Sequence, residues 1–323
     1  MASNAPASPT SPTSSSDHHE PTPTLEKQPS IDGHHTSEEP EYATGLRLFL
    51  VMTTIIMATF LAGLEIGIIA TAIPGITDAF HRLDDVGWYG SATFLLGGAV
   101  SPMWGKFYKY FNVQYIYLST IALYMIASIV GGSASNSTSV IVGRAIQGWG
   151  ATGTLGGSVL IISYVAEPKL RPMLIGTWMS VLLVSTILGP IVGGAFTSEV
   201  SWRWCFWINL PLGGPIVVMI LLFLRMPKHV KPTPATWKEI LQQLDLPGFS
   251  LLLGSLICFT LALQWGGQSK AWKSGPVVAT LVLGVFLTGM FFIVEWLQGP
   301  RAIIPLSLLK PRLTWTNALY SFM

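Results

Sequence analysis

The sequence predicts an all-α polytopic membrane protein, and three observations support this fold class. Half of the 323 residues are hydrophobic and only 11% are charged, whereas about a quarter of the residues in a soluble domain are charged. The charges are separated by long apolar runs, and a bilayer-spanning helix needs about 20 mainly apolar residues. These runs are continuous and do not alternate in polarity, which excludes a transmembrane β-barrel.

The apolar runs place eight membrane-spanning helices along the chain. We expect them at about 46–73, 88–107, 113–131, 140–166, 172–196, 204–224, 246–266 and 276–297. Pro74 is expected to end the first helix, because proline lacks the backbone N–H that helix continuation uses. A ninth helix is expected to begin near Leu313, and the residues from there to Met323 are too few to cross a bilayer.

These elements divide the chain into five regions. Residues 1–44 are rich in Ser, Thr, Pro and acidic side chains, so we expect a disordered tail. Residues 45–225 form a six-helix bundle, 226–245 a basic amphipathic loop, 246–298 two additional helices, and 299–323 the approach to a truncated ninth helix. Lysine and arginine gather on the side of the tail, so the positive-inside rule makes the tail, the loop and the approach cytoplasmic.

Two charged residues lie deep inside predicted spans: Glu65 in the first and Arg144 in the fourth. Such residues usually face the protein interior and pair with one another. The two helices run in opposite directions, and at 1.5 Å per residue Arg144 and Glu65 lie about 6 and about 12 Å below the same membrane surface. We therefore expect an ion pair. Burial favours the protonated form of Glu65 and the arginine favours the ionised form, which suits proton exchange; a static pair that locks two helices is the alternative.

The fifth span carries a spaced set of small residues and one proline. They are Gly176, Ser185, Gly189, Pro190, Gly193 and Gly194. Small residues let a neighbouring helix approach closely, and proline kinks a helix. We expect the small residues to share one stripe of this helix.

Several of these patterns resemble one known family. The run Gly143-Arg144-x2-Gln147-Gly148-x-Gly150 is similar to the helix-4 motif of the major facilitator superfamily. The fifth-span spacing is similar to that superfamily's antiporter motif, with Ser185 in place of a glycine. Ser201-Trp202-Arg203-Trp204 and Ile208-Asn209-Leu210-Pro211 resemble the fourteen-helix drug:proton antiporter branch. The likeness is greatest to fungal efflux pumps for toxins and secondary metabolites.

The resemblance implies two six-helix halves with two extra helices between them. This chain would supply the first half, built as 3+3 inverted repeats, together with the extra pair, and the C-terminal half is missing. The resemblance also implies that Arg144 takes part in proton coupling, here with Glu65, and that the fifth-helix motif sets the efflux direction. The inner-gate loop departs from the family, because Lys109, four residues after Gly105, replaces an aspartate. The charge relay at that gate therefore cannot form in the usual way, so the gate either uses another contact or is impaired.

We expect proton-coupled efflux of an amphipathic secondary metabolite, toxin or drug, of the kind that confers multidrug resistance. The expected partners are the small organic substrate, protons and the lipid bilayer; the proton gradient supplies energy, and no cofactor is needed. The sequence has no signature of an enzyme, a metal site or nucleic-acid binding. Uptake by the same superfamily and a truncated, non-transporting remnant are the alternatives.

The expected location is the plasma membrane, with a vacuolar or vesicular membrane as the alternative. The run Asn136-Ser137-Thr138 is a glycosylation sequon in a predicted outer loop, so Asn136 is a candidate for a glycan. Cys205 and Cys258 fall in predicted spans and are expected to be small apolar side chains rather than disulfide or metal partners.

Overall fold

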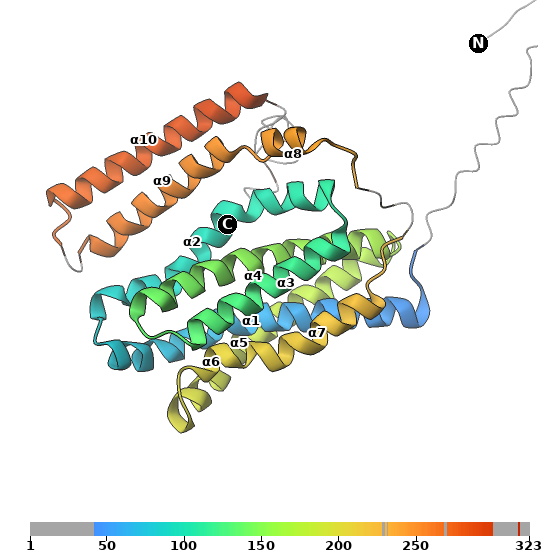
Figure 1. Ribbon diagram of the computed structural model, residues 1–323. Helices are drawn as coiled ribbons and strands as arrows, with labels where there is room; N and C mark the ends of the chain where they lie inside the picture. Colours follow the sequence, from blue (N-terminus) through green and yellow to red (C-terminus); the bar gives the residue numbers. More distant parts are fainter. Residues whose placement is uncertain (1–41, 228–229, 231, 268–269, 300–315, 317–323) are drawn as a thin grey trace, which may run out of the picture. The chain divides into compact units, whose positions relative to one another are not determined.

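The computed structural model describes residues 42–227, 230, 232–267, 270–299 and 316, and these residues are mainly helical (Figure 1). The first helices are α1 (Gly45–Phe80), α2 (Val86–Tyr110), α3 (Val113–Gly132), α4 (Ser137–Val165) and α5 (Arg171–Glu199). They are followed by α6 (Trp204–Trp207), α7 (Asn209–Phe223), α8 (Trp237–Gln243), α9 (Leu246–Trp265) and α10 (Gly275–Gln298). A short 3-10 turn, η1 (Leu83–Asp85), precedes α2.

Six helical segments in the described part are both long enough and apolar enough to cross a membrane. They contain α1, α3, α5, the pair α6 and α7, the pair α8 and α9, and α10. The other two predicted spans are α2, with 25 residues, and α4, with 29 residues. Both have the necessary length. They contain more glycine and polar residues, and α4 directs its polar side chains toward α1, α2 and α3, as described below.

The prediction that Pro74 ends the first helix is wrong. The helix α1 passes through Pro74 and continues to Phe80. One missing N–H removes only one hydrogen bond, and the surrounding helix tolerates this loss. The helix ends at His81, whose backbone is left-handed (φ 52°) and whose N–H donates to the Thr77 carbonyl at 2.8 Å.

The predicted sixth span is divided into α6 and α7. Ile208 separates the two helices, although its backbone angles (φ −58°, ψ −25°) remain helical. Pro211 is the local cause, because it has no N–H to donate to the carbonyl four residues earlier, that of Trp207. The chain therefore keeps its direction but loses a regular hydrogen bond where the sixth span begins.

The first six spans pack in two related groups. The helix α1 packs most closely against α5, and α4 packs most closely against α3 and α2. In an inverted repeat the first span corresponds to the fourth and the second to the fifth. The α1–α5 contact therefore corresponds to the α4–α2 contact, and both are close. Figure 1 shows the helices of this bundle running side by side. The buried apolar core lies mainly among α1, α3, α4 and α7.

The additional helices α9 and α10 form a hairpin, and α9 contacts α2 (Figure 1). Much of the apolar surface of α10 is exposed, for example at Val282, Phe286 and Ile293. An aliphatic and aromatic surface of this kind is typical of a helix that faces lipid.

The predicted tail lies outside the described residues except for residues 42–44. Of these, Ala43 is buried, and its N–H donates to the carbonyl of Val165 at 3.0 Å. That carbonyl is one of the groups left without an intrahelical partner at the end of α4. Regular packing therefore begins slightly before the predicted boundary. Of the predicted region 299–323, the structure describes only Gly299 and Thr316.

Candidate functional site

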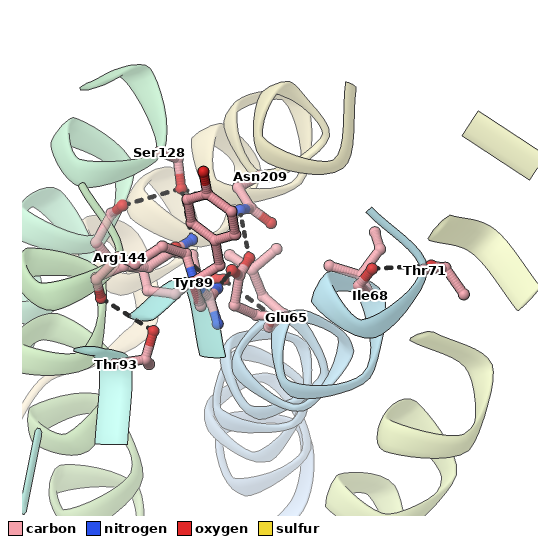
Figure 2. Close-up of polar contacts among 11 residues, drawn as sticks. Glu65, Ile68, Thr71, Tyr89, Thr93, Ser128, Arg144 and Asn209 are labelled. Atoms are coloured by element: carbon pink, nitrogen blue, oxygen red, sulfur yellow. Dashed lines mark hydrogen bonds and ion pairs between the residues drawn. The ribbon is translucent and has the colours of Figure 1, made fainter. Parts of the chain in front are cut away.

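The centre of the bundle holds an ion pair between Arg144 of α4 and Glu65 of α1. Both side chains are nearly inaccessible, with exposed fractions of 1% and 3%, and Nη1 of Arg144 contacts Oε1 of Glu65. The Nε of Arg144 also donates to the backbone carbonyl of Tyr89 on α2 at 3.0 Å (Figure 2). Buried charges are tolerated only when they are paired and hydrogen-bonded. The ion pair therefore fastens three helices at one point.

The second carboxylate oxygen of Glu65 binds two other helices. It accepts hydrogen bonds from Nδ2 of Asn209 on α7 at 3.1 Å and from the hydroxyl of Tyr124 on α3 at 3.3 Å. The hydroxyl of Ser128, also on α3, accepts from Asn209 at 2.9 Å and from Gln147 at 3.0 Å. Five helices thus meet in one continuous polar network, part of which is drawn in Figure 2.

The sequence did not identify Tyr124, Ser128 and Asn209 as members of this site. Asn209 gave a usable signal, because it is an uncharged polar residue inside an apolar run, where polar side chains are costly without partners. Tyr124 and Ser128 gave none, since tyrosine and serine also occur singly on the surface of membrane helices. Their part in the network depends on the rotation of α3, which the weak periodicity of a membrane helix does not fix.

The helix-4 motif serves two purposes in the structure. Gln147 accepts a hydrogen bond from Arg144 at 3.3 Å and so belongs to the polar network. Gly143 and Gly150 face α3, and a Cβ on Gly150 would lie 2.7 Å from the Thr120 carbonyl oxygen. Gly148 faces α2, where a Cβ would overlap the backbone carbonyl of Thr93. These glycines let α4 approach α2 and α3 closely enough to bury the arginine.

The small residues of α5 lie on two faces rather than on one stripe, so this prediction is wrong in part. Ser185, Gly189 and Gly193 are buried against α1, and a Cβ on Gly189 would lie 2.6 Å from the Cα of Gly67. A Cβ on Gly176 or Gly194 would meet nothing within 4 Å. A helix turns about 100° per residue, so nine positions place Gly176 opposite Ser185.

Pro190 lies at the edge of the α1 contact. Its side chain is exposed, but its Cδ would lie 2.8 Å from a Cβ on Gly67. The helix α5 continues through Pro190 to Glu199. The proline therefore belongs to the same close contact as Gly189, rather than to the open face that carries Gly176.

The inner loop between α2 and α3 contacts the segment that follows α7. The backbone carbonyl of Lys109 accepts from the N–H of Thr233 at 3.1 Å, and its ammonium group lies 5.1 Å from the ring centre of Tyr110. The hydroxyl of Tyr110 donates to the side chain of Gln243. Gly105 is exposed and open on its Cβ side. Within the described ranges no carboxylate forms an ion pair with Lys109.

A cavity of about 260 Å³ opens beside the ion pair between α1, α2 and α4. Its polar lining includes Glu65, Arg144 and Thr93, and its apolar lining includes Phe94 and Leu155. A carboxylate that lines a cavity has a route for proton exchange even when its exposed fraction is small. The mixture of a large apolar wall and a few polar groups is typical of a small-molecule site.

Asn136 lies at the start of α4 and is exposed. Its Oδ1 accepts from the N–H of Ser139 at 2.8 Å and so caps the helix. The cap uses the oxygen of the amide, whereas a glycan is attached to the nitrogen. Glycosylation of Asn136 stays a prediction.

The described residues contain no group of three or more His, Cys, Asp or Glu side chains that could hold a metal ion. The two cysteines are free thiols; Cys205 is buried and Cys258 is partly buried. The fold and the site together define a polytopic α-helical membrane protein with a buried ion pair beside an apolar cavity.

Comparisons with known proteins give the family. A family model described as Major Facilitator Superfamily matches residues 55–319. The chain is 66% identical over 285 residues to "Efflux pump notK" of Aspergillus sp. (strain MF297-2), covering 88% of this chain and 51% of that protein. It is 64% identical over 314 residues to the "Dehydrocurvularin exporter" of Alternaria cinerariae, covering 97% of this chain and 54% of that protein.

The chain therefore belongs to the Major Facilitator Superfamily, and the predicted likeness to fungal efflux pumps is confirmed. It spans about half the length of the curated relatives it matches. Among solved structures, the human organic anion transporter MFSD10 (TETRAN) has a TM-score of 0.50 at 15% identity, covering 78% of this chain and 72% of that chain. This similarity supports the fold.

Proposed function

We propose that this chain carries the proton-coupling machinery of an exporter that moves an amphipathic secondary metabolite out of the cell in exchange for protons. The observation that supports this proposal most is the Glu65–Arg144 pair at the edge of an apolar cavity. Relatives that are 64–66% identical are named efflux pump or exporter. The protein acts in the plasma membrane with its N-terminus in the cytoplasm.

The mechanism follows from the charges of the site. When Glu65 is ionised, Arg144 neutralises it and the pair holds α1 to α4. When Glu65 binds a proton from the cavity, the carboxyl group becomes neutral and the attraction to Arg144 weakens. The two helices then separate at lower cost, and the cavity between them changes its shape. A proton that binds Glu65 from outside the cell and is released to the cytoplasm thereby drives the substrate in the opposite direction, out of the cell.

The chemical class of the substrate follows from the cavity. Its largely apolar wall suits a ring or chain of carbon atoms, and its polar end suits a hydroxyl or carbonyl group. Dehydrocurvularin is the natural probe, because two relatives that are 64% and 65% identical to this chain are named as its exporters. The fifth-helix motif, through its contact with α1, favours export over uptake.

The experiment measures dehydrocurvularin inside cells that produce this chain, alone and together with the C-terminal half of the Alternaria cinerariae relative. We expect lower intracellular amounts than in cells without the chain, and a return to the control level when a protonophore collapses the gradient. Accumulation that depends on the chain would overturn export and favour uptake. No effect in either combination would favour a non-transporting chain.

A further inference from the structure

Asn209 has a special position in the polar network. It is the first residue of α7, its side chain is 1% exposed, and it lies one residue beyond the break between α6 and α7. The Nδ2 group donates to Glu65 at 3.1 Å and to Ser128 at 2.9 Å, so both of its hydrogens are used. The hydrogen bond from Asn209 to Glu65 joins α7 to the carboxylate at the centre of the network.

The three groups that donate to Glu65 differ in what they can do once the carboxylate is protonated. A guanidinium such as that of Arg144 only donates, and it offers nothing to a carboxylic O–H. The amide of Asn209 both donates and accepts, as does the hydroxyl of Tyr124. A half-turn of the Asn209 side chain brings its oxygen to the place of its nitrogen, where it can accept from the protonated Glu65.

The same half-turn leaves Ser128 with a partner. In the present arrangement the Ser128 hydroxyl accepts from Asn209 and donates to the Tyr124 carbonyl at 3.1 Å. After the turn, the hydroxyl hydrogen rotates toward the amide oxygen, which has two lone pairs. The Ser128 hydroxyl and the Glu65 carboxyl group then keep a partner in both states, and a buried group without one would be costly.

We propose that Asn209 is a positioning residue that holds Glu65 in both protonation states and links the proton site to the start of α7. The proposal rests on the proposed proton-coupled function of Glu65. The titratable groups placed against Glu65 are Arg144 from α4 and Tyr124 from α3. The helix α2 contributes the Tyr89 carbonyl to Arg144, and neither α5 between residues 172 and 198 nor α7 has a charged residue.

The test follows the protonation of Glu65 directly, by an infrared titration of the full chain in lipid nanodiscs. The carboxyl band of protonated Glu65 is identified as the one that Glu65→Gln removes. In Asn209→Leu both protonation states of Glu65 lose a partner. The ionised state loses the stronger, charge-assisted hydrogen bond, so the midpoint of the Glu65 titration moves to higher pH by about one unit. Asn209→Asp keeps the shape of the side chain at position 209. It adds a second carboxylate, which moves the midpoint of the Glu65 titration further toward higher pH.

Gln264→Leu is the matched control. Gln264 is also an amide in a membrane-spanning helix, but it lies on α9 and donates to Ser91 at 2.8 Å. We expect it to titrate as the wild type does. An unchanged midpoint in both Asn209 variants would overturn the proposal; if Asn209→Leu does not fold, an unchanged midpoint in Asn209→Asp alone would do so.

The second measurement is the pH dependence of dehydrocurvularin export by the same variants. A shifted titration midpoint without proton-linked export in the wild type would contradict the proposed function and leave the role of Asn209 at Glu65 standing. Proton-linked export with unshifted Asn209 variants would contradict the role of Asn209 alone.

Discussion

Arg144 on α4 and Glu65 on α1 contact one another directly although 79 positions separate them in the sequence. Both side chains of this ion pair are buried, with exposed fractions of 1% and 3%. A pair of this kind contributes little to stability as a whole, because desolvation offsets the attraction, but the loss of one partner leaves an uncompensated charge. Removing one charge and removing both therefore have different expected effects on stability.

Removing one charge should destabilise the protein more than removing both. We expect Arg144→Ala to lower the free energy of unfolding by about 3–5 kcal/mol. The double variant Glu65→Gln with Arg144→Gln should recover most of this loss, since no buried charge remains. Thermal unfolding in nanodiscs measures the stability of the single and the double variant. A double variant as unstable as Arg144→Ala would show that the pair does not act as a unit.

Gly148, where α4 meets α2, should not tolerate a side chain. A methyl group at Gly148 would overlap the Thr93 carbonyl, so Gly148→Ala should cost about 1–3 kcal/mol and impair the adjoining cavity. Gly156→Ala on the same helix is the control, because a Cβ there meets nothing within 4 Å. Equal stability of the two variants, measured by thermal unfolding, would contradict the described contact.

The two faces of α5 should respond differently to the same substitution. Gly189→Ala should disturb the α1–α5 contact and reduce export, because its Cβ would lie 2.6 Å from Gly67. Gly176→Ala and Gly194→Ala should retain stability. Thermal unfolding and export assays on all three variants separate the faces. Loss of export in Gly176→Ala without loss of stability would assign the open face a separate part in transport.

Glycosylation of Asn136 should be detectable without harm to α4. Protein produced in a glycosylating host should migrate faster after treatment with a glycosidase. Asn136→Asp should remove this shift and keep the helix cap, since aspartate caps as well as asparagine. Wild-type protein that does not change its mobility would rule out the modification in that host.

Much of this architecture could be predicted from the sequence, because a bilayer imposes long apolar helices whose limits are visible as composition. The pairing of Glu65 with Arg144 could be anticipated for the same reason, since two opposite charges at similar depth have few other partners. Close helix contacts were visible as glycine spacing. The passage of α1 through Pro74 could not be predicted, because it depends on the packing that supports the helix on both sides of the proline.

The remaining members of the site depend on helix rotation. Asn209, Tyr124 and Ser128 reach Glu65 only because α7 and α3 turn particular sides toward α1. A helix that is apolar all round has no strong pattern to fix that rotation. The same limit explains Gly176 and Gly194, which share a spacing motif with Gly189 but not its face.

The central claim is that protonation of Glu65 is coupled to export. The most direct measurement places this chain, joined by the C-terminal half of the Alternaria cinerariae relative, in inside-out membrane vesicles and imposes a pH gradient. We expect the gradient to drive dehydrocurvularin into the vesicles, protons to leave them at the same time, and Glu65→Gln to abolish both movements while substrate binding persists. Gradient-driven uptake of dehydrocurvularin by Glu65→Gln at the wild-type rate would contradict the claim.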